Sequence, residues 1–152
     1  MSAEALLKRV DLFRGLTQVE LAEIDAIAER RTCAADSTLV EEGKKGDTLY
    51  IIEKGRVRID LKLTSDSDCA TVHRLREGQT LGELSLVDSR RRSATATCET
   101  DCEIVAIPSE KLKELFDRDC SIGFTVILNL ARIVAERLRK TNLQLVATVC
   151  WE

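Results

Sequence analysis

Hydrophobic and polar positions follow three different patterns along the chain. Near the N-terminus, Thr17 and Glu20 have the spacing of a capping box, and apolar residues then recur at helical intervals. This pattern predicts a helix from about Thr17 to Arg30. Between residues 38 and 107 the apolar residues instead occur in short or alternating runs, which predict strands at 49–52, 57–61, 72–75, 84–87 and 104–107.

The third pattern begins where the strands end. Pro108 closes the strand region, and Ser109 is predicted to cap a short helix. A long amphipathic helix should follow, because apolar residues recur at intervals of three or four: Ile127, Leu130, Val134, Leu138, Thr141 and Leu145. Such a stripe has to be covered. The sequence leaves open whether the helix closes a binding pocket as a lid, pairs with a second copy as a dimer, or does both.

Length and composition indicate one globular domain. The 152 residues are 44% hydrophobic and 32% charged, as in ordinary soluble proteins, and contain no repeat or linker-like stretch. We expect a single domain over residues 1–152, with N-terminal helices in 1–35, strands in 36–108 and C-terminal helices in 109–146. Many short strands separated by turn residues are typical of a sandwich or closed roll.

Charge and hydropathy exclude several classes of partner. The net charge of −3 argues against a broad contact with nucleic acid or an anionic membrane, both of which need clustered Lys and Arg. The N-terminus lacks the apolar core of a secretion signal, and no stretch approaches the ~18 apolar residues of a membrane span. We therefore expect a cytoplasmic protein without membrane contact.

The cysteines and the histidine do not have the pattern of a metal site. None of the six cysteines forms a Cys-x-x-Cys pair, and His73 is the only histidine, so zinc-ligand spacing is absent. Free thiols are expected in the cytoplasm. Cys98 and Cys102 could flank a turn but are predicted to be small core hydrophobes. We expect no metal and no cofactor.

The candidate chemistry lies between Leu81 and Thr95. A glycine at position 82 allows the backbone to approach a ligand closely, and amides at a helix start can point toward an anion. Arg92 adds a fixed positive charge with two parallel donors. A carboxylate such as Glu83 beside a phosphate must accept hydrogen bonds from hydroxyl groups, so this combination favours a sugar phosphate.

The segment Leu81-Gly82-Glu83-Leu84-Ser85-Leu86, followed by Arg92-Ser93-Ala94-Thr95, resembles the phosphate-binding cassette of the cyclic nucleotide-binding domain family, here residues 81–95. In that family Gly-Glu-x-(Ala/Ser)-Leu precedes Arg-(Ala/Ser/Thr)-Ala-(Thr) at this distance. The upstream run Glu42-Gly43-x-x-Gly46-Asp47-x-Leu49-Tyr50-Ile51-Ile52-x-x-Gly55-x-Val57 is similar to the family's early strands and turns. The resemblance covers roughly residues 12 to 146.

The resemblance implies a fold and a set of binding roles. The fold is α+β and mainly β, an eight-stranded antiparallel β-roll (jelly roll) flanked by N-terminal helices and a long C-terminal helix. Glu83 would bind the ribose 2′-hydroxyl, Arg92 the cyclic phosphate, and the amides of Gly82, Glu83, Leu84 and Ser85 would help to seat the nucleotide, while Ser93 and Ala94 line the pocket. Thr141 and Asn142 are similar to a residue pair that contacts adenine, although Thr141 could equally be tolerated in a packing face.

The expected function is that of a sensor without catalysis. The ligand would be cyclic AMP, with cyclic GMP as the alternative because a hydroxyl at Ser93 can also donate to guanine. The chain stops ten residues after Asn142, so this catabolite activator protein-like effector domain is expected to stand alone without a helix-turn-helix. Direct DNA binding is then not expected, and the output would pass to an unidentified protein partner, with a homodimer formed through the C-terminal helix.

Two other interpretations fit the sequence less well. A ligand-free β-roll that serves only as a protein-binding scaffold would not need both Glu83 and Arg92, and a cupin-like metal enzyme would need more than one histidine. The neighbouring Arg90 and Arg91 are expected to be solvated. No site role is expected for His73 or for Trp151.

Overall fold

Two four-stranded antiparallel sheets form the body of the protein. The structure, a computed structural model, describes residues 3–64 and 68–150. One sheet has the strand order β1-β8-β3-β6 and the other the order β2-β7-β4-β5. The strands are β1 (Glu29–Cys33), β2 (Thr38–Val40), β3 (Thr48–Lys54), β4 (Val57–Lys62), β5 (Cys69–Leu75), β6 (Thr80–Leu81), β7 (Thr95–Cys98) and β8 (Cys102–Pro108). The predicted eight-stranded antiparallel roll is confirmed.

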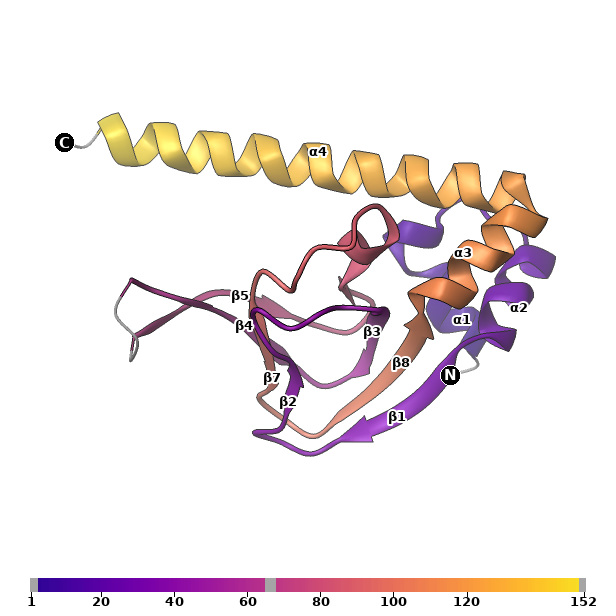
Figure 1. Cartoon of the computed structure of the whole chain (residues 1–152), viewed down its shortest axis with the longest axis horizontal. Coiled ribbons are helices and arrows are strands. Elements are labelled where there is room, and N and C mark those ends of the chain that lie inside the picture. Colours follow the sequence, from indigo (N-terminus) through magenta and orange to yellow (C-terminus); the bar gives the residue numbers. More distant parts are fainter. Residues whose placement is uncertain (1–2, 65–67, 151–152) are drawn as a thin grey trace.

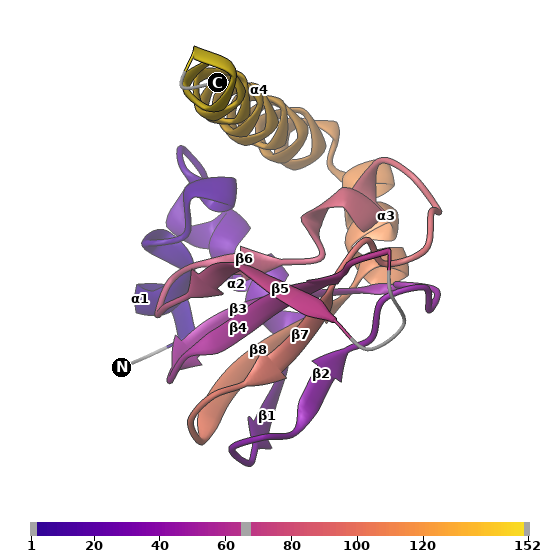
Figure 2. The same ribbon diagram turned by 90° about the vertical axis from the view of Figure 1, so that its left-hand side faces the viewer.

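The helices gather at one end of the roll and along one side of it (Figure 1). They are α1 (Ala3–Lys8), the 3₁₀ turn η1 (Asp11–Phe13), α2 (Gln18–Ala26), the 3₁₀ turn η2 (Glu83–Leu86), α3 (Ser109–Arg118) and α4 (Cys120–Cys150). The long α4 stands apart from the sheets and is seen nearly end-on in Figure 2. None of the described helices combines the length and the apolarity needed to cross a membrane.

Alternation along the central strands builds two hydrophobic clusters. On β3, Leu49 and Ile51 pack in the cluster formed with the N-terminal helices, whereas Ile52 packs in the cluster between the two sheets. On β8, Ile107 faces the helices and Ile104 the other sheet. Because successive side chains of a strand point to opposite faces, one sheet serves both clusters. The sheet β1-β8-β3-β6 is therefore the middle layer of the molecule.

The predicted capping box of α2 is present, but the helix is shorter than expected. The Thr17 hydroxyl accepts a hydrogen bond from the Glu20 amide at 3.2 Å, and the Glu20 carboxylate accepts one from the Thr17 amide at 2.9 Å. The helix ends at Ala26 rather than near Arg30, because Glu29–Cys33 pairs as β1 with residues 102–106 of β8. The last turn of the predicted helix is thus absent, because its residues pair with a distant strand instead.

Two other local predictions were wrong. Residues 84–87 were expected to form a strand, but Glu83–Leu86 forms a 3₁₀ turn that begins after Gly82, whose φ is +83°. A short apolar run cannot distinguish strand from helix by its period. Ser109 is the first residue of α3 rather than its cap; Pro108 occupies the cap position without a side-chain hydrogen bond. Trp151 lies outside the described residues.

The first half of α4 is anchored to the body. Ile122, Val126 and Leu130 are buried against the N-terminal helices and α3. The amide of Asn129, itself buried, donates to the carbonyl oxygens of Leu12 and Arg14 at 3.0 and 2.8 Å. This pair of bonds satisfies one backbone acceptor within the 3₁₀ turn η1 and one directly after it, and it ties α4 to that turn. From residue 136 onward every described residue of the helix is exposed.

Candidate functional site

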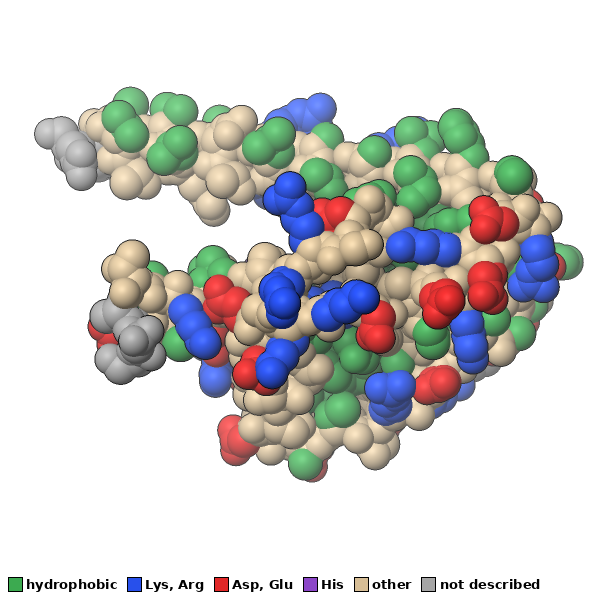
Figure 3. Space-filling model, in the orientation of Figure 1, with side chains coloured by type: hydrophobic (Ala, Val, Ile, Leu, Met, Phe, Trp, Pro, Cys, Tyr) green, Lys and Arg blue, Asp and Glu red, His purple; other side chains and the backbone are tan. Residues whose placement is uncertain are grey.

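A cavity of about 870 Å³ opens between the roll, the loop of residues 82–94 and α4. Its volume lies within the range of about 300–1,000 Å³ that small-molecule sites occupy. Figure 3 shows the hollow between the roll and the far half of α4, with Lys and Arg side chains at its inner end. A second cavity of about 310 Å³ adjoins it and shares several lining residues, among them His73, Arg137 and Lys140.

The structure gathers most of the predicted site residues around the large cavity. Eight of them line it: Gly82, Glu83, Leu84, Ser85, Arg92, Ser93, Ala94 and Thr141. Asn142 is not among the lining residues. At about 100° per residue along a helix, Asn142 is displaced from Thr141 toward the side of α4 that faces away from the cavity. The tertiary structure thus separates the two residues that the sequence placed together.

Glu83 is buried, with 3% of its surface exposed, and it lies beneath α4. Its carboxylate accepts a hydrogen bond from the guanidinium of Arg137 on that helix, which makes an ion pair 54 residues apart in sequence. A buried carboxylate needs such a partner. The sequence did not predict this role for Arg137; its position one turn before Thr141, on the same side of the helix, is the signal that could have indicated it.

Arg92 is held by the backbone around it. Its guanidinium donates to the carbonyl oxygen of Thr48 at 2.6 Å, and its own amide donates to the carbonyl of Lys44 at 2.7 Å. The side chain passes between two glycines. A Cβ on Gly46 would overlap with the guanidinium group and lie 2.7 Å from its Cδ, and a Cβ on Gly82 would lie 2.7 Å from the Thr48 oxygen as well as against the guanidinium. Both glycines are therefore needed for the position of Arg92. The sequence predicted this role for neither of them, since Gly82 was expected to let the backbone approach the ligand.

The rest of the basic lining is more exposed. Arg90 and Arg91 are exposed, as expected, although both lie at the rim of the cavity. Arg91 donates to the carbonyl oxygen of Gly43 at 2.8 Å. Together with Arg92, Arg137 and Lys140 they outnumber the carboxylates of the lining, which come from Glu83 and Asp88. The cavity is therefore suited to an anionic ligand.

Hydroxyl groups attach the cassette to α3. The Ser85 hydroxyl is 2.7 Å from the carbonyl oxygen of Gly82 and 2.6 Å from the hydroxyl of Ser109, which is buried. Ser109 was predicted only as a helix cap. Its actual contact joins the turn that carries Glu83 to the first turn of α3, so the cassette and the C-terminal helices cannot shift independently without breaking this bond.

On the α4 side the cavity is lined by polar residues at helical spacing. Thr141 and Gln144 both line it, together with Arg137 and Lys140. The hydroxyl of Thr141 donates to the carbonyl oxygen of Arg137 at 2.9 Å, one turn back on the helix. Its proton is thus used within the helix, which leaves the oxygen free to accept. Gln144 was not identified from the sequence.

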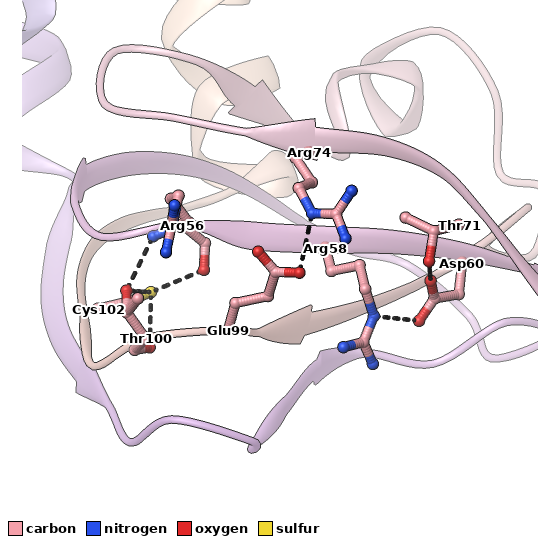
Figure 4. Close-up of polar contacts among 8 residues, drawn as sticks. All are labelled: Arg56, Arg58, Asp60, Thr71, Arg74, Glu99, Thr100 and Cys102. Carbon is pink, nitrogen blue, oxygen red and sulfur yellow. Dashed lines mark hydrogen bonds and ion pairs between the residues drawn. The ribbon is translucent and has the colours of Figure 1, made fainter.

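Polar contacts stiffen the sheet that forms the floor of the cavity (Figure 4). Ile59 of β4 lines the cavity, and its neighbours Arg58 and Asp60 pair with each other at 2.8 Å. The hydrogen bond from Arg58 lowers the pKa of Asp60, and the hydroxyl of Thr71 on β5 also donates to Asp60 at 2.7 Å. Arg74 of β5 pairs with Glu99 at 2.9 Å. These bonds link β4, β5 and the loop after β7.

The core cysteines behave as the sequence predicted. Cys98 and Cys102 are buried between the sheets, and burial raises the pKa of the Cys98 thiol to about 12, so this thiol stays protonated. His73 is exposed on β5 at the edge of both cavities. Within residues 3–64 and 68–150, no group of three or more side chains of the metal-ligating types is close enough to hold a metal ion.

Comparisons of the sequence with a family model and with known proteins point to the same family. Residues 30–119, more than half of the chain, match the family described as "Cyclic nucleotide-binding domain". The chain is 30% identical over 139 residues to the cyclic AMP receptor protein of Thermus thermophilus, covering 91% of this chain and 62% of that protein. It is 31% identical over 112 residues to a cAMP-dependent protein kinase regulatory subunit of Aspergillus fumigatus, covering 74% of this chain but only 26% of that protein.

A solved structure shows the same fold. The catabolite activator protein of Thermus thermophilus superposes with a TM-score of 0.78 at 31% sequence identity, over 89% of this chain and 61% of that protein. The chain thus spans less than two thirds of the length of each of these three relatives.

Proposed function

The chain belongs to the cyclic nucleotide-binding domain family, and from that premise we propose that it is a non-catalytic receptor for a cyclic mononucleotide. The observation that supports this most directly is the cavity that brings Glu83 and Arg92 together in a basic surrounding. The preferred ligand is cyclic AMP, with cyclic GMP second. The ligand state is passed to a protein partner.

The roll side of the cavity fits the sugar phosphate. The guanidinium of Arg92 has five N–H donors, and the bond to Thr48 uses one, so others can pair with a cyclic phosphate. A carboxylate has several acceptor positions, so Glu83 can accept from a ribose 2′-hydroxyl while it remains paired with Arg137. Gly82 and Ser85 bring the backbone of the cassette against the ligand, and Ser93 and Ala94 form the adjoining wall.

The helix side favours adenine over guanine. At the corresponding edge, adenine carries an amino group that donates, whereas guanine carries a carbonyl oxygen that accepts. The Thr141 hydroxyl already donates its proton to the Arg137 carbonyl, so it is an acceptor for a base placed beside it. An amino group satisfies that acceptor and a carbonyl oxygen does not. Cyclic AMP is therefore the preferred ligand in this proposal.

The exposed half of α4 is the output surface in this proposal. Val134, Leu138 and Leu145 expose 40%, 60% and 63% of their surfaces. Apolar side chains in such a row are normally covered by another molecule. We propose a symmetric homodimer through α4, in which nucleotide binding at Arg137 and Thr141 biases the position of the helix.

The first test is ligand-dependent thermal stability of the full chain. A ligand that binds only the native state adds about 2.7 kcal/mol at a hundredfold excess over Kd, so cyclic AMP should raise the melting temperature clearly and more than cyclic GMP. Linear 5′-AMP should raise it much less. No shift with either cyclic nucleotide at millimolar concentration would favour the ligand-free scaffold and overturn the proposal.

The same assay examines the ribose contact. Glu83→Ala should weaken cyclic AMP binding but change the binding of the 2′-deoxy analogue little, because only the ribose form loses a hydrogen bond. Equal losses for both nucleotides would remove Glu83 from the ribose role. A measurable shift that survives in the variant also shows that the altered chain is folded.

A further inference from the structure

The sole histidine of the chain, His73, stands where the two cavities meet. It belongs to the small set of residues that line both of them. Its imidazole makes no hydrogen bond and no ion pair with any other residue in 3–64 or 68–150. A lone histidine has no second metal ligand beside it, which is why the sequence indicated no role for it. A polar ring that faces a cavity without a partner is nevertheless available to a ligand.

The pairing of β4 with β5 turns His73 toward the large cavity. His73 lies opposite Ile59 in the register of the two strands. Directly opposed residues carry their side chains on the same face of a sheet, and Ile59 also lines the cavity. The next residue of β5, Arg74, lies on the other face, where it pairs with Glu99 (Figure 4). His73 is therefore part of the cavity floor and not of the outer surface of the sheet.

A β-bulge brings a second side chain of β5 to the same place. His73 is opposite Ile59, whereas Thr71 is opposite the next residue of β4, so Val72 is an extra residue in the ladder. Bulges redirect side chains and are frequent beside functional sites. Here the consecutive residues Val72 and His73 both line the cavity, and Val72 exposes 52% of its surface. The strand thus offers a ligand an exposed apolar side chain next to a flat ring.

His73 carries the only aromatic ring among the described residues that line either cavity. Phe13, Tyr50 and Phe116 pack in the two hydrophobic clusters instead. A nucleobase has flat faces that bind well to aromatic side chains, and histidine is one of the residues on which bases stack in proteins. A base in this cavity can therefore find an aromatic face at His73 and at no other described residue of the lining.

We propose that His73 is the stacking platform for the base and that it selects cyclic purine nucleotides over cyclic pyrimidine nucleotides. The inference rests on the proposed function and adds to it. There Thr141 distinguishes adenine from guanine by a contact at the edge of the base, whereas a ring face distinguishes bases by the area that they offer. The two fused rings of a purine cover an imidazole more fully than the single ring of a pyrimidine. From the other side the base is closed in by α4, whose Lys140 and Gln144 line the cavity.

Nuclear magnetic resonance of the untagged full chain tests the contact directly, because one histidine gives unambiguous imidazole signals. At about pH 8.5, above the range in which histidines ordinarily change charge, cyclic AMP should move the imidazole C–H signals upfield through the ring current of the stacked purine. Cyclic CMP should move them less. Signals that stay in place while cyclic AMP raises the melting temperature would overturn the platform and leave nucleotide binding intact.

Calorimetry of two variants separates stacking from the filling of space. His73→Leu keeps a side chain of similar size but removes the ring, so Kd for cyclic AMP should rise by about fivefold or more and Kd for cyclic CMP by less than about twofold. His73→Phe keeps a ring and should retain the preference for the purine. Arg74→Leu is the matched control, since it changes the next residue, on the opposite face of the sheet, and should alter neither Kd.

Two results would refute the role of His73 alone. One is an equal loss of cyclic AMP affinity in His73→Leu and His73→Phe, which would show that the ring face is not used. The other is a wild type that binds cyclic AMP and cyclic CMP equally well. The absence of a thermal shift with every cyclic nucleotide would instead overturn the proposed function, and this inference with it.

Discussion

The two sides of the large cavity are built in different ways. On the roll side, Glu83 is buried and Arg92 is fixed by the carbonyl of Thr48 and by two glycines. On the helix side, the residues that reach the cavity stand on a segment of α4 that is exposed throughout. The roll therefore holds its charged side chains in fixed positions, whereas α4 provides contacts that can change.

The free energy of burying apolar side chains also differs between the two halves of α4. Fully burying a leucine contributes about 1.5–3 kcal/mol. Leu130 gains that contribution in the anchored half of α4, whereas Leu138, with 60% of its surface exposed, does not gain it in the single chain. The ion pair between Arg137 and Glu83 joins a half-exposed guanidinium to a buried carboxylate, so water screens the charge of Arg137 but not that of Glu83. The position of the far half of α4 can thus be shifted by a ligand or by a second copy.

The largest loss of cyclic AMP affinity should come from a substitution on the roll side of the cavity. Arg92→Leu removes the partner of the phosphate, and losing one member of a buried charge pair costs about 2–5 kcal/mol, or roughly a 30- to 5,000-fold rise in Kd. Isothermal titration calorimetry with cyclic AMP measures the change. Arg90→Leu, two residues earlier at the rim of the same cavity, should change Kd little. Equal losses in the two variants would show that the phosphate is held by general positive charge and not by a preformed seat.

An intermediate loss of cyclic AMP affinity is expected from a residue that positions Arg92 but does not contact the ligand. Gly46 does not have the positive φ that restricts a position to glycine, so alanine there is resisted mainly by Arg92. Gly46→Ala should force Arg92 off its rotamer at a cost of about 0.5–1.5 kcal/mol, which raises Kd for cyclic AMP by about 2- to 13-fold.

The control for this prediction is a double-mutant cycle on thermal stability. In an Arg92→Ala chain the obstructing side chain is gone, so Gly46→Ala should no longer lower the melting temperature. If the alanine destabilises both backgrounds equally, Gly46 serves the turn itself and does not position Arg92.

The smallest loss of cyclic AMP affinity should come from a substitution on the α4 side of the cavity. Arg137→Met removes the ion pair with Glu83 from the free and the nucleotide-bound protein alike, so cyclic AMP affinity should fall by less than about fivefold. Hydrogen exchange in α4 beyond residue 137 should accelerate, because the helix loses its link to the roll. Lys140→Met is the matched control, since Lys140 lines the same cavity but pairs with Glu136 of its own helix at 3.6 Å. If Arg137→Met abolishes binding as Arg92→Leu does, the helix is part of the fixed seat and the comparison fails.

The cassette could be recognised from the sequence because its parts are contiguous. Gly82, Glu83 and Arg92 lie within eleven residues, so one continuous segment carries the resemblance to the family's phosphate-binding cassette. The partners that hold them could not be recognised in this way. Arg137 lies 54 residues from Glu83, and Gly46 lies 46 residues before Arg92. No local pattern connects such pairs, because only the folding of the roll brings them together.

The helical period of α4 could also be recognised in the sequence. Which part of its apolar face packs against the core could not. The sequence predicted one apolar stripe through Leu130, Leu138 and Thr141, yet the structure places Leu130 in the core, Leu138 on the outer side and Thr141 at the cavity. A period of 3.6 residues shows that a helix has an apolar face. It does not show how wide that face is or which part of it meets the protein's own core.

By itself the sequence determined the class of fold, the capping box of α2, the cassette and the buried thiols, because each depends on residues that are close together in the chain or on composition. The tertiary structure decided where α2 ends, that residues 83–86 form a 3₁₀ turn, that Arg137 reaches Glu83 and that Asn142 faces away from the cavity. These outcomes depend on strand pairing and on the docking of α4 against the body, and the free energy of such contacts comes from residues that no local sequence window contains.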